Sequence, residues 1–181
     1  RAGATAKDPR RGAWRGERGL HPNSLLRNNG DGTFADVTEE AGLLRFRPTQ
    51  TGMWADFDND GFLDLFIGNE QQEGGPPHPS ELYRNNGDGT FTDIAAASGV
   101  ADLGFVKGAT WGDFNNDGRS DLYVSRFRQP NVLFRNDGPA GSDRDAWRFT
   151  DVTAAAGVPG PLKSFPTWFF DYDNDGWLDI F

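Results

Sequence analysis

The 181-residue chain carries 27 acidic and 18 basic side chains, a formal charge of −9, so that its surface would repel the phosphates of a nucleic acid. It has no cysteine and only two histidines, which excludes disulfide bonds and leaves no zinc-binding spacing. No stretch approaches the ~20 apolar residues that a membrane-spanning helix needs.

The first 20 residues differ in composition from the rest. They hold six Lys or Arg against two acids, are rich in glycine and contain no apolar run, so they do not form a signal peptide. We expect residues 1–20 to be a basic, disordered or linker segment. The acidic character of the chain therefore belongs to residues 21–181.

A string of apolar and turn-forming residues begins at Leu25 and ends at Thr38. It returns at residues 82–94 and, split by an insertion, at residues 133–138 and 149–153. Two apolar runs joined by an Asn/Asp/Gly cluster predict a β-hairpin. The Asp-Gly pairs at residues 31–32 and 88–89 are then turn residues rather than an ion site.

Each hairpin is followed by a short Ala-rich stretch that ends on Gly42, Gly99 or Gly157. A threonine before the alanines, Thr38 or Thr153, suits the N-cap of one helical turn, and the glycine suits its end. We also expect each hairpin arginine to pair with an aspartate across the hairpin. These pairs are Arg27 with Asp36, Arg84 with Asp93 and Arg135 with Asp151.

A second string, Asp-x-Asp/Asn-x-Asp-Gly-x-x-Asp, occurs three times. Its copies begin at Asp56, Asp113 and Asp171, which are 57 and 58 residues apart. Alternate oxygen ligands, with glycine at the sharp bend, are what a hard divalent cation needs from a short loop. The predicted ligands are the side chains at places 1, 3, 5 and 9 and the backbone carbonyl at place 7. They are Asp56, Asp58, Asp60, Phe62 and Asp64; Asp113, Asn115, Asp117, Arg119 and Asp121; and Asp171, Asp173, Asp175, Trp177 and Asp179.

Electrostatics favours an ion in these loops over an acidic surface turn. Carboxylates ~4–5 Å apart repel by roughly 4 kcal/mol per pair at an effective dielectric constant near 20, and several pairs would outweigh a net domain stability of about 5–15 kcal/mol. Calcium is favoured over magnesium because a flexible cage of protein oxygens suits the larger ion. We expect about three calcium sites, with the second the weakest because Asn115 replaces a carboxylate.

The loop is not an EF-hand, because its twelfth residue is Ile67 or Val124 rather than glutamate and its flanks favour strands. Each repeat unit holds four short strands. In the first full unit they are expected near residues 51–55, 63–68, 82–85 and 91–94, with the acidic loop between the first two. A four-stranded sheet in each repeat of 40–60 residues predicts a β-propeller blade.

The fold class is therefore all-β, with blades of four antiparallel strands in an incomplete propeller of about three blades. The predicted divisions after the basic segment are a partial blade (21–48), two blades with a calcium loop (49–105 and 106–163) and the start of a further blade with a calcium loop (164–181). We expect the rest of the propeller to lie in a longer parent chain, because both ends would leave strand edges unpaired.

Aromatic and small residues before the loops, Trp54-Ala55 and Trp111-Gly112, are expected to pack between neighbouring blades. The third copy has Phe169 in the tryptophan position and the bulky Phe170 in the small one. We therefore expect a local β-bulge there.

These strings carry a family resemblance. The segment WADFDNDGFLDLFIGN followed by LYRNNGDGTFTDIAAASGV resembles the FG-GAP/VCBS repeats of integrin-α-type propellers, and more closely those of the cartilage acidic protein (ASPIC/UnbV) group. The resemblance covers roughly residues 21–181. It implies a seven- or eight-bladed propeller with structural calcium in its loops, on a secreted, cell-surface or periplasmic protein, and a binding surface elsewhere.

The sequence predicts no catalysis. His21 and His78 both adjoin proline outside the repeat, and a carboxylate that holds a cation cannot act as a free acid or base. The loop at residues 71–80 and the insertion at residues 139–147 interrupt the repeat, so they are the best candidates for a specific binding surface.

Two functions remain open. The first is a calcium-stabilised, non-catalytic module for adhesion or protein recognition, and the second is a carbohydrate-binding or carbohydrate-active propeller, of lectin or lyase type. The partner is accordingly a protein or a glycan. The residues available for a glycan site are Trp147, Arg126 and Arg128.

Overall fold

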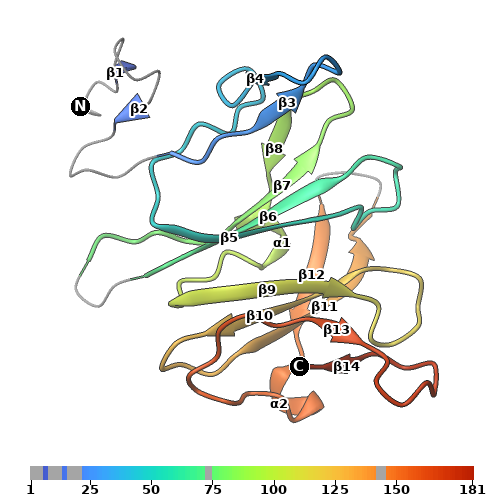
Figure 1. Ribbon diagram of the computed structural model, residues 1–181. Helices are drawn as coiled ribbons and strands as arrows, with labels where there is room; N and C mark the ends of the chain where they lie inside the picture. The colour runs from blue at the N-terminus through green and yellow to red at the C-terminus, as the bar shows by residue number, and fades with distance from the viewer. Residues whose placement is uncertain (1–5, 8–13, 16–21, 72–74, 142–145) are drawn as a thin grey trace.

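The computed structural model describes residues 6–7, 14–15, 22–71, 75–141 and 146–181 (Figure 1). The prediction for residues 1–20 falls almost entirely outside this range, which includes only the paired strands β1 (Ala6–Lys7) and β2 (Trp14–Arg15) there. As predicted, the chain is all-β with four-stranded antiparallel sheets. Within the described residues, the sheets do not close into a ring, and no helix is long and apolar enough to cross a membrane.

Two four-stranded sheets form the body of the molecule, each with its strands in chain order. All four strands expected in the first unit are present, within one or two residues of the predicted bounds. The first sheet consists of β5 (Thr49–Ala55), β6 (Asp64–Asn69), β7 (Glu81–Asn85) and β8 (Phe91–Asp93). The second consists of β9 (Val106–Gly112), β10 (Asp121–Arg126), β11 (Val132–Pro139) and β12 (Trp147–Asp151).

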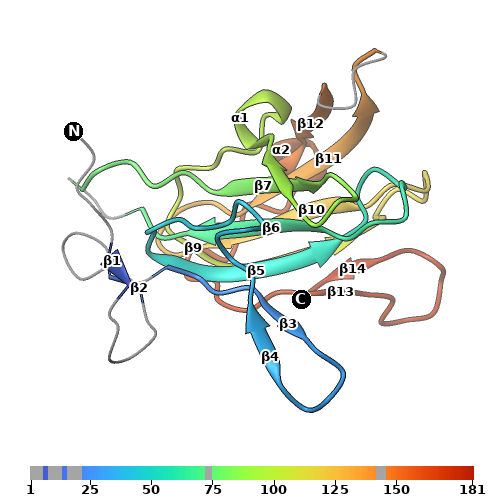
Figure 2. The ribbon, with the colours of Figure 1, turned by 90° about the horizontal axis from the view of Figure 1, so that it is seen from above.

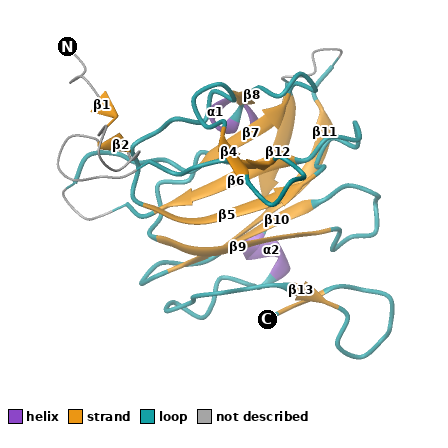
Figure 3. Ribbon diagram, turned by 45° about the horizontal axis from the view of Figure 1, so that its top comes forward, coloured by secondary structure: helices purple, strands orange, loops and turns teal. Residues whose placement is uncertain are grey.

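A two-stranded hairpin lies at each end of this body (Figure 1), and the later of the two is seen below the second sheet in Figure 3. The first, β3 (Leu26–Asn28) and β4 (Phe34–Asp36), corresponds in sequence to the last two strands of a sheet. The other, β13 (Phe169–Phe170) and β14 (Asp179–Ile180), corresponds to the first two. The two hairpins are therefore complementary halves of one repeat.

The sheets follow one another through their first strands, since β5 contacts β9 and β9 contacts β13 (Figure 2). The interface between the two complete sheets is an apolar cluster. Phe66 and Leu82 of the first sheet meet Leu122 and Val124 of the second there, and all four side chains are fully buried. Stacking of four-stranded sheets through their faces is the arrangement of propeller blades.

The expected packing of the second aromatic–small pair between blades is confirmed. Trp111 stacks on Phe57, on the loop between β5 and β6, with ring centroids 6.2 Å apart, and its Nε1 donates to the carbonyl of Met53 in β5 at 3.3 Å. A Cβ atom on Gly112 would lie 2.7 Å from the ring of Phe169 in the next hairpin, so only glycine allows this approach. The equivalent Trp54 is 43% exposed, because no first strands precede the first sheet within the described residues.

The prediction of a β-bulge in the third copy is wrong. Phe170 pairs with Asp179 in regular register, as Ala55 pairs with Asp64 in the first sheet. The bulk of Phe170 is accommodated because its side chain is exposed, so the backbone has no reason to shift. The register shifts of the sheets lie elsewhere, near residues 49–51, 125–126 and 136–138.

The second and third Ala-rich stretches form single helical turns, α1 (Ala95–Ser98) and α2 (Thr153–Ala156), and end as predicted on glycines with positive φ. The first stretch, which ends on Gly42, forms a turn but no helix. The predicted threonine N-cap is wrong, because Thr153 is already the first helical residue. Its Oγ1 accepts from the amide of Leu133 at 2.8 Å and donates to Asp151, and thereby ties the turn to β11.

The expected arginine–aspartate pair across the third hairpin does not form. The register places Arg135 opposite Thr150 and Asp151 opposite Phe134, so the two charged side chains leave opposite faces of the sheet. Arg135 instead donates to Asp137 at 2.7 Å. The aspartates Asp36, Asp93 and Asp151 each accept an amide two residues later, where the helical turn or its equivalent begins.

Candidate metal centres

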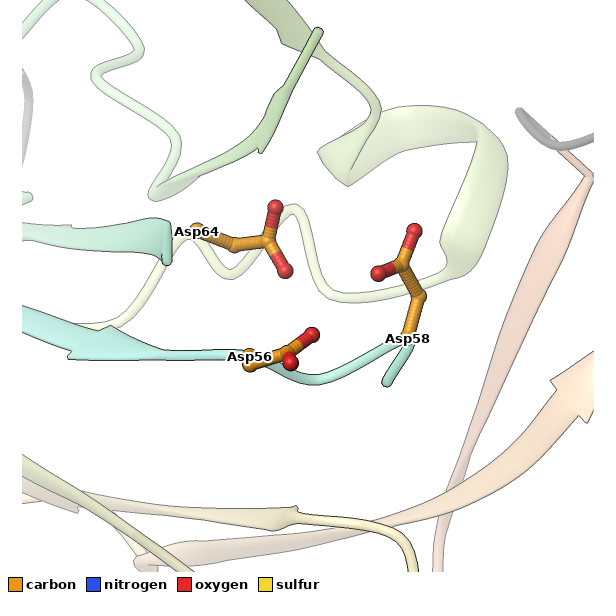
Figure 4. Close-up of side chains that lie close together, drawn as sticks. All are labelled: Asp56, Asp58 and Asp64. Carbon is orange, nitrogen blue, oxygen red and sulfur yellow. The ribbon is translucent and has the colours of Figure 1, made fainter. Parts of the chain in front are cut away.

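The first acidic loop joins β5 to β6 and gathers three carboxylates. Asp56, Asp58 and Asp64 each offer an oxygen, and these oxygens all lie within 4.8 Å of one another (Figure 4). Asp56 follows β5, Asp58 lies on the loop, and Asp64 begins β6. The three predicted ligands at places 1, 3 and 9 therefore converge.

Backbone hydrogen bonds give the loop its shape. Both oxygens of Asp56 accept amides from the far side of the bend, Oδ1 from Asp60 and Oδ2 from Gly61, each at 3.0 Å. Asn59 and Gly61 have φ of 57° and 90°, which asparagine and glycine adopt at little cost. The backbone therefore requires these residues at their positions in the string, whether or not a metal is bound.

Asp64 connects the loop to the rest of the sheet. Its carboxylate is fully buried and accepts the amide of Phe57 at 3.1 Å and that of Asn85, in β7, at 2.8 Å. The pKa of Asp64 is raised to about 7, chiefly by burial and in addition by the charges of Asp58 and Asp60, against the lowering effect of the two amides. An anion in this position is costly unless a positive charge lies beside it.

The third loop repeats this arrangement at the start of the last hairpin. Oxygens of Asp171, Asp173 and Asp179 lie within 4.8 Å of one another, and the amide of Tyr172 donates to Asp179 at 3.0 Å. No strand corresponding to β7 follows in the described chain, so the second amide found at Asp64 has no counterpart. The loop is otherwise a copy of the first.

The second loop has the same backbone hydrogen bonds as the first, but it carries fewer carboxylates. Asp113 accepts the amides of Asp117 and Gly118 at 3.0 and 2.7 Å, and Asp121 accepts those of Phe114 and Asn136 at 3.1 and 2.7 Å. Burial raises the pKa of Asp121 to about 6. Since place 3 is an asparagine, Asn115, this loop contains no cluster of three carboxylates.

The aspartates at place 5 do not join the carboxylates at places 1, 3 and 9. Asp60 and Asp175 lie outside the carboxylate clusters and accept the amide two residues later, each at 2.9 Å. In the second loop, Arg119 donates to the carboxylate of Asp117 at 2.5 Å. Coordination by place 5 and by the backbone carbonyls of Phe62, Arg119 and Trp177 stays a prediction.

The structure adds a contact that the sequence reading did not anticipate. The asparagine at place 4 donates to the glycine carbonyl at place 6 of the following loop: Asn59 to Gly118 at 2.9 Å, and Asn116 to Gly176 at 3.1 Å. The sequence contains a sign of this contact, because asparagine occupies place 4 in all three copies of the string. Consecutive loops are thereby linked across the boundary between sheets.

The residues considered for a glycan site have structural roles. Trp147 is half-buried against the core and donates from Nε1 to Asn136 at 2.6 Å, and Arg126 forms an ion pair with Asp102 at 2.5 Å. Arg128 lies over the ring of Phe127. These three side chains therefore do not form an exposed aromatic platform.

The remaining polar candidates also have local partners. Asp31 and Asp88 each accept the amide of a threonine two residues later at 2.9 Å, which confirms them as turn residues. His78 lies 3.3 Å from Arg47, while burial, followed by the charge of Arg47, lowers its pKa. His21 lies outside the described residues.

Comparison with known proteins agrees with this architecture. The FG-GAP-like repeat matches residues 13–67, 56–124 and 113–181, so that almost the whole chain is covered. The chain belongs to the FG-GAP-like repeat family.

Three proteins are similar in sequence to most of this chain. Cartilage acidic protein 1 of Xenopus tropicalis is 31% identical over 150 residues, which is 82% of this chain and 21% of that protein. The proteins of the same name from Homo sapiens and Mus musculus are 31% and 29% identical over 164 residues, 90% of this chain. The chain thus spans between 21% and 24% of the length of these relatives.

Proposed function

We propose that this FG-GAP repeat module is a non-catalytic interaction scaffold whose sheets are stabilised by calcium in the acidic loops. The observation that carries the proposal is the convergence of three carboxylates in the first loop and of three in the third. A cation at each cluster would neutralise charges that the backbone otherwise holds together at a cost.

The donor set fits calcium. Each cluster offers only oxygen atoms, on a loop that also contains backbone carbonyls for further coordination, and six to eight oxygen ligands are typical of Ca²⁺. Magnesium keeps several waters and prefers a smaller, strictly octahedral shell. The second loop, with Asn115 and with Arg119 on Asp117, would be the weakest of the three sites.

Calcium in the first loop would act on more than the loop itself. Asp64 accepts an amide of β7, and Asn59 donates to the second loop, so an ion that holds these residues stabilises contacts between strands and between sheets. Binding to the folded state alone stabilises it by about 2.7 kcal/mol at a free calcium concentration 100 times the dissociation constant.

A structural role for calcium suits a calcium-rich location. Sites of this kind in extracellular modules bind at about 10⁻⁴–10⁻³ M, which is appropriate to a secreted, cell-surface or periplasmic protein. The name of the relatives, cartilage acidic protein 1, agrees with this proposal. The partner would be a protein or a glycan bound outside the acidic loops, with the segments at residues 71–80 and 139–147 as the first places to test.

Thermal unfolding of the metal-stripped chain, followed by circular dichroism, tests the proposal. Calcium should raise the melting temperature by several degrees, and magnesium at the same concentration should raise it much less. Combined replacement of Asp58→Asn and Asp173→Asn, which lie in the two clusters, should remove most of the gain. The replacement Asp88→Asn in a hairpin turn is the matched control and should keep it. Equal melting temperatures with and without calcium, together with no bound calcium in calorimetric titration, would contradict the proposal.

A further inference from the structure

Three phenylalanine rings form a cluster on the connections between strands. Phe105 lies just before β9 and Phe127 just after β10, whereas the second acidic loop joins the other ends of these two strands. The ring of Phe127 meets those of Phe105 and Phe165 edge to face, with centroids 5.8 and 5.7 Å apart. Phe105 and Phe127 are only half-buried. An aromatic surface therefore lies at the end of the sheets opposite the acidic loops.

Two cations lie over these rings. The Nζ of Lys107 is 4.5 Å from the ring centroid of Phe105, and the guanidinium of Arg128 is 5.1 Å from that of Phe127. Attraction between a cation and the face of a ring holds both side chains in place. Lys107 also pairs with Glu70, whereas Arg128 takes part in no ion pair within the described residues. The exposed charge of Arg128 is thus held beside the rings without an acidic partner there.

The backbone holds Arg128 in an unusual conformation. Its φ is 60°, in the left-handed region that long side chains rarely adopt. The other described non-glycine residues with positive φ are the asparagines at place 4 of the acidic loops, and asparagine tolerates this conformation. Neighbouring connections fix the backbone here, since the amide of Phe127 donates to the carbonyl of Phe105 at 2.9 Å and that of Arg128 to the carbonyl of Leu162. Strain that the surrounding structure maintains in this way is concentrated at functional sites.

The surface around the rings is basic, although the chain as a whole has a charge of −9. Two acids at this surface are each paired with a cation, Glu70 with Lys107 and Asp102 with Arg126. Two further cations remain, Arg128 and the exposed Lys163, whose backbone pairs with that of Phe127. Net positive charge beside apolar rings attracts a partner that is itself anionic.

We propose that this surface binds an acidic segment of a partner protein, in which a carboxylate lies beside a large apolar side chain. The carboxylate accepts from the guanidinium of Arg128, whose planar fork suits bidentate pairing. The apolar side chain packs on the exposed parts of the phenylalanine rings. The inference names a partner for the interaction scaffold proposed above and rests on that role, but it does not require calcium.

The surface adjoins one of the segments already considered for binding. The amide of Gln71 donates to the carbonyl of Gly104 at 3.2 Å, next to Phe105 in the chain. The loop at residues 71–80 therefore begins at the edge of the aromatic surface. A bound segment that extends from the rings can reach this loop.

The arrangement of the rings favours a protein over a glycan. A sugar stacks on the flat face of an aromatic side chain and needs hydrogen-bonding groups for its hydroxyls. The three rings meet at interplanar angles of 89° and 65°, so that they share no flat face, and phenylalanine has no hydrogen-bonding group. Aromatic residues and arginine are, in contrast, enriched at the centres of protein–protein interfaces.

Selection from a phage-displayed library of random short peptides, on the intact chain in calcium-containing buffer, tests the proposal. Fluorescence anisotropy then measures the affinity of the most enriched peptide for the wild-type chain and for two variants. Arg128→Asn removes the charge and keeps the left-handed backbone at little cost. Arg148→Asn is the matched control, because Arg148 is also exposed and lies on β12, outside the aromatic surface. Circular dichroism checks that both variants keep their sheets.

The enriched peptides should combine aspartate or glutamate with a large apolar residue. Arg128→Asn should weaken their binding by about fivefold or more, as loss of an arginine anchor does, and the control should stay within about twofold of wild type. An increase in salt of about tenfold should weaken binding to the wild-type chain more than to Arg128→Asn, because salt screens the pair that the variant lacks.

Three results would overturn the proposal. They are the absence of any enriched peptide, enrichment of peptides without acidic residues, and equal affinities for wild type and Arg128→Asn. A heparin oligosaccharide that binds at Arg128 when no peptide is enriched would instead identify a glycan site and reject the protein partner. Thermal unfolding with calcium separates the two proposals, since a chain that calcium stabilises but that selects no peptide loses only the inference drawn from the aromatic surface.

Discussion

The first and second acidic loops share one backbone and differ in charge. In both, the residues at places 1 and 9 accept the same backbone amides at similar distances. The first loop holds four aspartates, whereas the second holds three, an asparagine and an arginine that pairs with Asp117. Places 1, 6 and 9 therefore build the loop, while places 3 and 7 set its charge.

The largest effect on stability is expected at Asp64, where the first loop joins β6. Replacement of Asp64→Ala leaves the buried amides of Phe57 and Asn85 without an acceptor, at about 1–3 kcal/mol each. The free energy of unfolding should therefore fall by about 2–6 kcal/mol in urea titration. The matched change Asp60→Ala removes one acceptor outside the carboxylate cluster and should cost about 1 kcal/mol. Equal losses in the two variants would contradict the distinction between places 5 and 9.

The buried carboxylates should make the metal-free chain less stable at higher pH. Burial raises the pKa of Asp64 to about 7 and that of Asp121 to about 6 in the folded chain, so that the folded state binds protons more tightly than the unfolded state. The stabilisation that comes from protonation of these two carboxylates is fully present near pH 4 and is lost as the pH rises through about 6 to 7. For Asp64 the loss in the free energy of unfolding is up to ~4 kcal/mol.

Urea titration of the metal-stripped chain at pH 5 and pH 8 measures this difference. Calcium should reverse the trend, because it binds the deprotonated carboxylates and so binds more tightly at pH 8. The same stability at both pH values without metal would show that these carboxylates are solvated in the folded chain.

The charge difference between the loops can be tested at place 7. Replacement of Arg119→Ala frees Asp117 from an ion pair that is partly exposed, worth about 0.2–1 kcal/mol. Calcium affinity of the second loop should rise by about two- to fivefold in calorimetric titration. The corresponding change in the first loop, Phe62→Ala, removes no charge and should leave the affinity of that loop unchanged. A fall in affinity after Arg119→Ala would mean that Arg119 positions the second loop.

The smallest effect is expected at the link between loops. Asn59→Gly keeps the positive φ and removes the hydrogen bond to Gly118, which should lower the free energy of unfolding by about 0.5–1.5 kcal/mol. Asn174→Gly is the control, since Asn174 has the same φ region at the end of the series, where no fourth loop follows in the described chain. If both variants lose the same stability, the link between the loops contributes nothing.

The strands and the loops were predictable because their signals are local. Alternating apolar runs bounded by Asn, Asp and Gly gave all four strands of the first sheet, and the turn roles of Asp31 and Asp88 involve residues only two positions apart. The pair of Arg135 with Asp151 was predicted wrongly because a shift of one residue in register moves a side chain to the other face of the sheet. Trp147 looked like a surface residue because its partners, Phe57 and Asn136, belong to other strands and loops.

The repeat, the positions of its strands and the bend of the acidic loops could be derived from the amino-acid sequence alone, because their signals lie within a few neighbouring residues. The packing of whole sheets was needed to show which carboxylates are buried and that Asn59 reaches a carbonyl 59 residues away. The physical reason is that burial, and the contacts of one sheet with the next, depend on how whole sheets pack, which no short segment specifies alone.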